Sequence, residues 1–509
     1  MASSLPAPAL SRLLGPWKRG TGPGYRELAE VVRLLILDGR LPLETALPSE
    51  RALSEELGVS RTTVTAAYAI LREQGFLSSG QGSRGRTRIP DLNGFGPSLS
   101  GLAGFATGFS GARSSGTGPA SGPATMTAPG LAAPEGLIDL AYSALPASGE
   151  MVHRAFAAAL TELPALLPGF GYDAIGLLPL RQAIADRYTA AGVPTRAAHI
   201  MVTSGAQHAL TIILRTLVER HDRVLVEHPS YPNALDAIRA ARCRALPVAF
   251  TAEGWDLPAL EAVIAEQRPR IAYLVPDFHN PTGMIMPDHQ RRRLVRAADA
   301  AGTVLVADET LRELNLDGVP TAPLAAFSSA VVTIGSLSKS HWAGLRTGWI
   351  RAAEPMIQRF TAARSVLDLG GPVMDQLAAA HLVRALDEPL PARLEDLRSN
   401  RAALLELLRQ HLPEWEPTYP VGGLSVWCRL PAPSSTALTV LAPEFGIRLA
   451  AGPRFGIGGA FERNLRVPFT LPPEKLKLAV LALRAAQERL NAAPQLRRTL
   501  RDPPATAIA

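Results

Sequence analysis

The sequence predicts a multidomain chain in which a small α+β winged helix-turn-helix is followed by a large α/β domain. Two short helical patterns joined by a glycine-containing turn lie near the start, and a long segment rich in Gly, Ser, Ala and Pro follows. Beyond it, short apolar runs alternate with helical patterns. We expect five segments, namely a flexible arm over 1–20, the winged helix over 21–88, a linker over 89–135, the α/β domain over 136–490 and a flexible tail over 491–509.

The predicted head begins with an amphipathic helix over 25–38. Ser49 is expected to cap a second helix that Gly58 ends, and Ser60 to cap a third. The third helix buries Val64, Tyr68 and Leu71 and opens its outer face with Arg61, Thr62 and Thr63. In a helix-turn-helix the second helix of the motif enters the major groove of DNA. The segment 75–89 can form two short strands around Gly80–Gly82, which predicts a wing.

Alternating strands and helices are predicted for the large domain. The apolar runs that read as strands cover 200–205, 223–229, 271–277, 303–309 and 331–337. This alternation predicts a parallel sheet wrapped by helices. Several runs end in polar residues, and ligands of open α/β sheets collect at the carboxyl ends of the strands.

Composition narrows the kind of protein and its compartment. Of the 509 residues, 47% are hydrophobic and 19% charged, which suits a large folded core. The two cysteines, Cys243 and Cys428, fit a reducing compartment. We find no signal peptide and no apolar run that could span a bilayer, so we expect a soluble, cytoplasmic protein without a membrane partner. Net charge is +7, and residues 1–90 hold 12 Arg and Lys against 8 Asp and Glu, which weakly favours a polyanion partner for the head.

Lysine is rare in this chain. The four lysines are Lys18, Lys339, Lys475 and Lys477, so Lys339 stands alone in the middle of an arginine-rich sequence. A lysine amine can form a Schiff base and an arginine cannot. Lys339 is therefore a candidate for covalent chemistry, the alternative being a chance surface lysine.

The segment LPSERALSEELGVSRTTVTAAYAILREQGFL resembles the winged helix of GntR-type regulators. The resemblance implies that Arg51 meets a DNA phosphate and that Arg61 donates two hydrogen bonds to guanine. The DNA-binding residues it implies are Arg51, Ser60, Arg61, Thr62, Thr63 and, at the wing tip, Gln81 and Gly82.

The segment from Ser336 to Lys339, with Arg346 seven positions later, resembles the Schiff-base segment of fold-type-I aminotransferases, whose cofactor is pyridoxal 5′-phosphate (PLP). That fold is an α/β domain with a smaller C-terminal α+β subdomain. The resemblance implies that Lys339 forms the Schiff base, that Asp308 keeps the pyridine nitrogen protonated and that Asn280 bonds the ring hydroxyl. It further implies a ring-stacking Tyr231, a phosphate site of Ser204, Gly205, Ala206, Gln207, Ser336, Ser338 and Arg346, and Arg466 as the clamp for an effector carboxylate. No metal site is expected.

A GntR-like head, a long linker and an aminotransferase-like domain together resemble the MocR family of regulators. The resemblance implies a head-to-tail homodimer in which PLP, alone or with an amino acid or amine effector, changes the grip on operator half-sites of double-stranded DNA. Two positions depart from the family pattern: Thr310 stands where a tyrosine near the ring hydroxyl is usual, and Tyr172 is offset by one from a tyrosine that reaches the partner subunit.

Three functions remain open on the sequence. The first is a PLP-responsive transcriptional regulator. The second is a working aminotransferase with an accessory DNA-binding head, whose transamination Thr310 puts in question. The third is a constitutive DNA-binding protein with a vestigial pocket. The intact Lys339, Asp308, Asn280 and Arg346 favour the first over the third, and the head favours it over the second.

Overall fold

The computed structural model describes residues 5–15, 17–18, 23–37, 41, 45–74, 76–78, 85–87, 137–251 and 253–492. These residues form two compact units, one ending at residue 87 and one beginning at Leu137. The predicted linker, the residues of the tail beyond 492, Gln81 and Gly82 lie outside the described residues. None of the helices in the described ranges combines the length and the apolar character that crossing a membrane requires.

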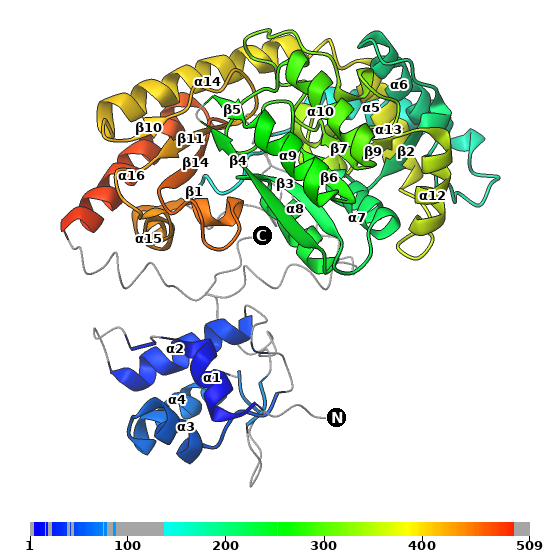
Figure 1. Ribbon diagram of the computed structural model, residues 1–509. Coiled ribbons are helices and arrows are strands. Elements are labelled where there is room, and N and C mark those ends of the chain that lie inside the picture. The colour runs from blue at the N-terminus through cyan, green and yellow to red at the C-terminus, as the bar shows by residue number, and fades with distance from the viewer. Residues whose placement is uncertain are drawn as a thin grey trace, which may run out of the picture. The chain divides into compact units, whose positions relative to one another are not determined.

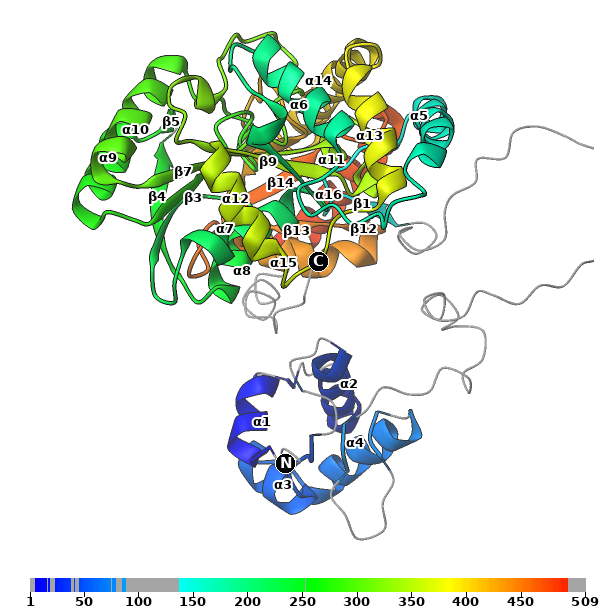
Figure 2. The ribbon, with the colours of Figure 1, turned by 90° about the vertical axis from the view of Figure 1, so that its right-hand side faces the viewer.

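The first unit is a helical head, whose four helices group around one core (Figure 2). They are α1 (Ala7–Leu14), α2 (Gly24–Leu37), α3 (Glu50–Leu57) and α4 (Arg61–Glu73). Ser49 and Ser60 cap α3 and α4, since their hydroxyls accept hydrogen bonds from the amides of Ala52 and Thr63, both at 3.2 Å. Antiparallel bridges join Leu77 to Thr87 and Ala46 to Arg86, where the wing is predicted.

The arm predicted as flexible contains a helix instead. Leu10 and Leu14 of α1 are buried in the core of the head, at 0% and 2% exposure. Apolar residues four apart share one face of a helix, and this face covers apolar surface of the head. The prediction failed because the segment is short and its helical pattern is no longer than two turns.

The second unit is built on an eight-stranded sheet (Figure 1). Its strands, in spatial order, are β2 (Ile200–Thr203), β9 (Gly348–Arg351), β8 (Val332–Ser336), β7 (Val304–Asp308), β6 (Ile271–Leu274), β3 (Arg223–His228), β4 (Arg244–Thr251) and β5 (Gly254–Trp255). All five runs predicted as strands contain one. The parallel neighbours β3 and β4 are joined through the helix α8 (Pro232–Ala240), and β6 and β7 through α10 (Asp288–Ala301).

The sheet is mixed, which corrects the expectation of a parallel one. β3, β4, β6, β7 and β8 run parallel, but β9 pairs antiparallel with both β8 and β2, and β5 pairs antiparallel with β4. The connection over 337–347 is shorter than a parallel crossover, which takes about a dozen residues or more. β9 therefore turns back beside β8.

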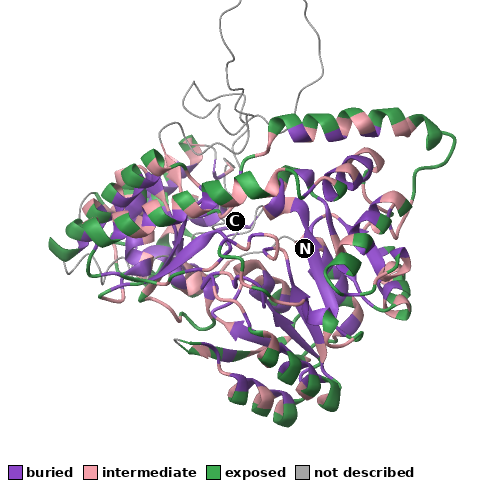
Figure 3. Cartoon of the chain, turned by 90° about the horizontal axis from the view of Figure 1, so that it is seen from above, coloured by how far each residue is buried: buried purple, intermediate pink, exposed green. Residues whose placement is uncertain are grey.

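Helices cover both faces of this sheet, and each face has its own apolar core. One face packs against α5 (Gly149–Glu162), α6 (Leu178–Ala190), α9 (Leu257–Gln267), α10 (Asp288–Ala301) and α13 (Val373–Arg384). The other packs against α7 (Ala206–Leu217), α8 (Pro232–Ala240) and α12 (Glu354–Arg364). In Figure 3 the buried strands lie between helices whose outward sides are exposed.

A smaller α+β subdomain completes the unit, as the fold class predicts. A four-stranded sheet of β10 (Glu416–Pro417), β11 (Ser425–Arg429), β14 (Asn464–Pro468) and β13 (Ala450–Ala451) lies with α14 (Leu390–His411), α15 (Ser435–Leu441) and α16 (Pro473–Ala492). β1 (Ile138–Asp139) pairs with β12 (Ile447–Arg448), which fastens the first described residues of this unit to the subdomain.

Candidate functional site

Lys339 lies on the short helix α11 (Leu337–Ser340), directly after β8. Its Nζ donates a hydrogen bond to the carbonyl oxygen of Ser143 at 2.7 Å. Burial, together with the positive charges of Arg466 and Arg346, lowers the pKa of Lys339 to about 8, although Asp308 opposes the shift. The uncharged, nucleophilic fraction of this amine near neutral pH is therefore larger than that of an ordinary lysine.

Asp308 ends β7 and is 6% exposed. Its carboxylate accepts hydrogen bonds from the hydroxyl of Tyr273 at 2.7 Å and from the amide of Thr310 at 3.0 Å. Burial raises the pKa of Asp308, while these two donors and Lys339 act in the opposite direction. Asp308 is thus a fixed, buried carboxylate at the carboxyl end of a strand.

Tyr273 is a residue that the sequence analysis missed. It lies on β6, next to β7, and is 1% exposed. Its position inside a strongly apolar run made it look like core. A hydroxyl within such a run was the available signal, because a buried tyrosine hydroxyl needs a hydrogen-bond partner.

Arg346 and the loop before α7 lie against each other. The Nη2 of Arg346 donates to the carbonyl oxygen of Ser204 at 3.0 Å. Gly205 has a φ of +89°, which side-chain-bearing residues rarely adopt, and a Cβ there would lie 2.7 Å from that Nη2, so glycine is favoured at this position. Gly205 is the N-cap of α7, which begins at Ala206 and whose Gln207 keeps a buried Oε1 without a partner among the described residues. A helix N-terminus beside a guanidinium suits an anion.

Two serines, Ser336 and Ser338, lie in the segment that leads to Lys339. The Oγ of Ser336 donates to the Oγ of Ser338 at 2.9 Å and accepts from the amide of Ser338 at 3.1 Å. Ser336 is at the end of β8 and Ser338 precedes Lys339. The sequence-predicted hydroxyls are therefore close to each other and to the candidate lysine.

Arg466 belongs to β14 of the subdomain but contacts residues of distant segments. It is 6% exposed, donates to Asn280 Oδ1 at 3.4 Å and to the carbonyl oxygen of Ala141, and lies over the ring of Phe455 at 4.9 Å. Its Nε has no partner among the described residues. Burial lowers the pKa of Arg466 to about 10. A buried guanidinium with a free donor is suited to a carboxylate ligand.

Tyr231 is the N-cap of α8, and its hydroxyl accepts a hydrogen bond from Asn233 Nδ2 at 3.0 Å. Burial, and then the negative charge of Asp308, raises the pKa of Tyr231, and Arg466 and Arg346 oppose this rise. The same charges act on Lys339. The structure thus brings these predicted residues into one electrostatic neighbourhood.

Thr310 and Tyr172 mark the two departures from the family pattern. Thr310 is half-buried and lines a cavity together with Ser336. Tyr172 is 75% exposed on its own subunit.

The candidate DNA-reading residues lie at the start of α4. Arg61 and Thr62 are exposed and Thr63 is half-buried, while Val64, Tyr68 and Leu71 face the core as predicted. Arg51 on α3 has an 80% exposed side chain and pairs with Glu55 at 2.9 Å. The outer face of α4 is therefore free to enter a groove within the part of the head that is described.

Comparisons with known proteins match each of the two units to a known family. Residues 168–483 match the family described as aminotransferase class I and II, and residues 24–86 match the bacterial regulatory proteins of the gntR family. The solved structure of LysN, an α-aminoadipate aminotransferase from Thermus thermophilus complexed with N-(5′-phosphopyridoxyl)-L-leucine, is 29% identical, with a TM-score of 0.66 over 70% of this chain and 94% of that one. The chain belongs to the aminotransferase class I and II family, whose cofactor is PLP.

Two regulators match across both units. The pyridoxine biosynthesis regulator PdxR of Corynebacterium glutamicum is 28% identical over 86% of this chain and 93% of its own. The probable rhizopine catabolism regulatory protein MocR of Rhizobium meliloti is 28% identical over 77% of this chain and 78% of its own. The chain therefore has the architecture of MocR-type regulators, a GntR-type DNA-binding head fused to an aminotransferase-like domain.

The site residues fit PLP on chemical grounds. A lysine with a lowered pKa can bond to an aldehyde, and a buried carboxylate suits a protonated ring nitrogen. The N-terminus of α7 at Gly205 lies beside the guanidinium of Arg346, a setting that suits the phosphate. The unpartnered Nε of Arg466 and Oε1 of Gln207 remain available to a ligand.

Proposed function

We propose that this protein is a DNA-binding transcriptional regulator that responds to PLP, with the aminotransferase-like domain as its sensor. The observation that carries the proposal is the joint presence of a lysine with a lowered pKa, a buried carboxylate and an exposed reading helix in one chain. Catalysis alone would not require the helix. We find no observation that favours an accessory role for the head, so the aminotransferase alternative is not preferred.

The pocket residues divide into groups by the part of the cofactor that each suits. Lys339 would bond to the aldehyde, Asp308 would pair with the ring nitrogen, Asn280 and Thr310 would serve the ring hydroxyl, and Tyr231 would stack on the ring. The residues that would hold the phosphate are Ser204, Gly205, Ala206, Gln207, Ser336, Ser338 and Arg346. When bound, PLP supplies a carbonyl that amines can attack and a ring that withdraws electrons. Arg466 holds the carboxylate of an amino-acid effector.

On the head, Arg61, Thr62 and Thr63 approach base edges and phosphates from the N-terminus of α4, and Ser60 presents that terminus. Arg51 contacts a phosphate once its weak surface pair with Glu55 opens. Residues 89–135 connect the head to the sensor. A regulator of this kind acts in the cytoplasm, where its DNA is.

A second copy of this chain completes the assembly as a head-to-tail homodimer. Two segments of the sensor domain expose apolar side chains side by side, joined by a bridge between Asp173 and Gly370. Their exposed members are Leu166, Leu167, Phe170 and Tyr172 in one segment and Val366, Leu367 and Leu369 in the other. A contiguous apolar patch of this kind is typical of an interaction surface.

Phe170→Asp is expected to weaken the dimer, because Phe170 is 98% exposed and the change places a charge in the proposed interface. Light scattering after gel filtration should show a shift towards monomer over a dilution series. Leu478→Asp on α16 is the matched control, since Leu478 is 59% exposed and lies outside the patch. A dimer that survives Phe170→Asp unchanged contradicts this interface.

Tyr273→Phe is expected to weaken PLP binding roughly tenfold or more, as a lost hydrogen bond to a charged group costs about 1.5–3 kcal/mol. Without the hydroxyl the carboxylate loses a donor, so the pKa of Asp308 rises further, and the loss of affinity should grow as the pH falls. Absorbance titrations with PLP at several pH values measure this. Tyr419→Phe, at a 64% exposed tyrosine, should behave as the wild type.

The capture of PLP by the cofactor-free protein should speed up with pH. Only the uncharged amine of Lys339 attacks an aldehyde, and its pKa is lowered to about 8. The rate should therefore rise through neutral pH, reach half its maximum at about pH 8 and level off above it. Stopped-flow absorbance gives the rate, and a half-maximum at the ordinary lysine pKa would contradict the environment described for Lys339.

The proposed function is tested by measuring binding to the DNA upstream of the protein's own gene, with and without PLP. We expect PLP to change the affinity. If both forms bind DNA equally well, PLP alone is not the signal. If neither form binds DNA selectively while amino donors are consumed, the aminotransferase alternative replaces the proposal.

A further inference from the structure

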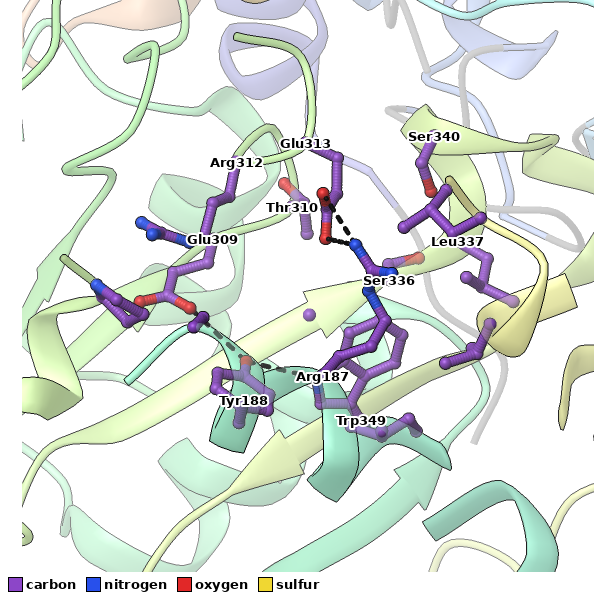
Figure 4. A pocket seen from close by; sticks show the side chains of 16 residues that line it. Arg187, Tyr188, Glu309, Thr310, Arg312, Glu313, Ser336, Leu337, Ser340 and Trp349 are labelled. Carbon is purple, nitrogen blue, oxygen red and sulfur yellow. Dashed lines mark hydrogen bonds and ion pairs between the residues drawn. The ribbon is translucent and has the colours of Figure 1, made fainter. Parts of the chain in front are cut away.

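A cavity of about 70 Å³ lies behind the segment that carries Lys339. A buried water needs roughly 10–15 Å³ by the same kind of measure, so this space accepts something larger than one water. Residues of α6, α13, β8, β9, the segment after β7 and the Lys339 segment surround it, and Figure 4 shows side chains from them converging on it. Lys339, Asp308, Asn280, Tyr231 and Arg466 are not among its lining residues, but Thr310 and Ser336 are, so the cavity adjoins the proposed cofactor site without containing its central residues.

One wall of the cavity is apolar and aromatic. Trp349 and Tyr188 form part of it, with Leu337, Val383 and Leu386. The indole Nε1 of Trp349 donates to the hydroxyl of Tyr188 at 3.3 Å, which fixes the two rings relative to each other. Such a wall suits the hydrocarbon body of a ligand, and its aromatic faces attract cations.

Glu309, a carboxylate that is 6% exposed, also lines the cavity, beside Tyr188. It accepts a hydrogen bond from the Leu324 amide at 3.3 Å and a long one from the Tyr188 hydroxyl at 3.4 Å. Within the described residues, no cation lies at ion-pair distance from Glu309. A buried carboxylate without a cation is costly.

The arginines around the cavity are bound to other carboxylates. Arg187 pairs with Glu313 and with Asp387, both at 3.2 Å. Arg312 pairs with Asp277 at 3.2 Å and also donates to a backbone carbonyl. Among the described residues Glu309 therefore has no ion-pair partner, although Arg312, Arg291 and Arg351 act on its charge from a greater distance.

We propose that this cavity binds a small protonated amine with an apolar body, whose ammonium pairs with Glu309 while its hydrocarbon packs on Trp349 and Tyr188. The site is distinct from the carboxylate clamp at Arg466. Because Thr310, Ser336 and Leu337 line the cavity, a bound amine lies against the backbone that positions Lys339. Any effect of the amine on DNA affinity rests on the proposed function, whereas the binding itself does not.

Because Glu309 titrates near neutral pH, amine binding there should be accompanied by proton release and should depend on pH. Burial raises the pKa of Glu309 to about 7; Arg312 and Arg291 lower it, and Asp277 raises it. The other titratable groups that face the cavity are Tyr188, Arg187 and Glu313. An ammonium stabilises the charged carboxylate, so binding near pH 7 releases a fraction of a proton, and affinity falls as the pH drops below about 7.

Trimethylammonium chloride is the probe, because a protonated tertiary amine has one N–H donor and cannot bond to the aldehyde of PLP. Its uncharged near-isostere tert-butanol is the ligand control. Calorimetry on the full-length holoprotein, in two buffers with different ionisation enthalpies, measures affinity and proton release together. We expect saturable binding of trimethylammonium with proton release, and no saturable binding of tert-butanol.

Glu309→Gln should weaken trimethylammonium binding at least tenfold and abolish the proton release. Glu388→Gln, at an exposed glutamate that pairs with Arg154, is the matched control and should bind as the wild type. Val383→Phe, which fills the cavity and keeps its charges, should also block binding. Absence of binding to the wild type, or equal binding to wild type and Glu309→Gln, overturns the proposal.

The PLP absorbance spectrum and DNA binding of the same samples separate this proposal from the function. If the wild-type protein binds PLP and DNA but not trimethylammonium, only the proposed amine site is contradicted. If the protein binds trimethylammonium through Glu309 but binds DNA equally with and without PLP, the amine site is supported and the proposed response to PLP is contradicted.

Discussion

Lys339→Ala should abolish the absorbance band of bound PLP and make the protein's DNA affinity independent of PLP. The change removes the nucleophilic amine, and no other lysine lies in the sequence between Lys18 and Lys475 to replace it. The phosphate and ring contacts remain, so PLP should still bind weakly and exchange freely on dialysis. Absorbance spectra before and after dialysis, together with DNA titrations by fluorescence anisotropy, measure both effects.

Lys475→Ala is the control for this experiment, because Lys475 is exposed on α16. It should keep both the spectrum and the response to PLP. An unchanged spectrum for Lys339→Ala would show that the covalent bond is not made at this lysine. A lost spectrum with an intact response would separate sensing from the bond.

Arg61→Ala should weaken operator binding by about 1–3 kcal/mol, or roughly five- to 150-fold, and relax specificity at one base pair. Arg61 is the first residue of α4, is exposed, and has a cap at Ser60 that does not depend on its side chain. The loss should therefore come from the DNA contact and not from the fold of the head. Anisotropy titrations against the operator and single-base variants measure it.

Arg33→Ala serves as the control in the head, since Arg33 pairs with Glu30 on α2, which is outside the helix-turn-helix pair of α3 and α4. It should change affinity little. If Arg61→Ala binds every variant as tightly as the wild type does, α4 is not the reading element. If it weakens binding evenly across all variants, Arg61 contacts a phosphate and not a base.

The sequence predicted the elements that depend on local patterns. Ser49 and Ser60 cap helices because their hydroxyls accept hydrogen bonds from amides three residues later. A serine at the start of a helical pattern can be recognised from the sequence alone. The strands around Asp308 and Lys339 are short apolar runs that end in polar residues, and this again is a local pattern. The candidate residues Asp308, Ser336 and Lys339 lie in or directly after these runs, so they were identified together with the strands.

What could not be predicted depends on contacts between distant residues. The antiparallel direction of β9 follows from the short connection after β8, but its place between β2 and β8 depends on distant strands, and no strand was predicted at Gly348–Arg351. Tyr273 acquires its role from a hydrogen bond to a neighbouring strand, 35 residues away. The cavity at Glu309 forms only where residues of α6 and β9 come together, so no single segment of the sequence predicts it.

Lys339 and Arg466 both donate to backbone carbonyls in one short stretch, at Ser143 and Ala141. That stretch follows β1 and is among the first described residues after the segment that leads from the head. A ligand that recruits either cation must compete with a carbonyl of this stretch for the same proton donors. We therefore expect occupancy of the pocket to change how firmly this stretch after β1 is held by hydrogen bonds.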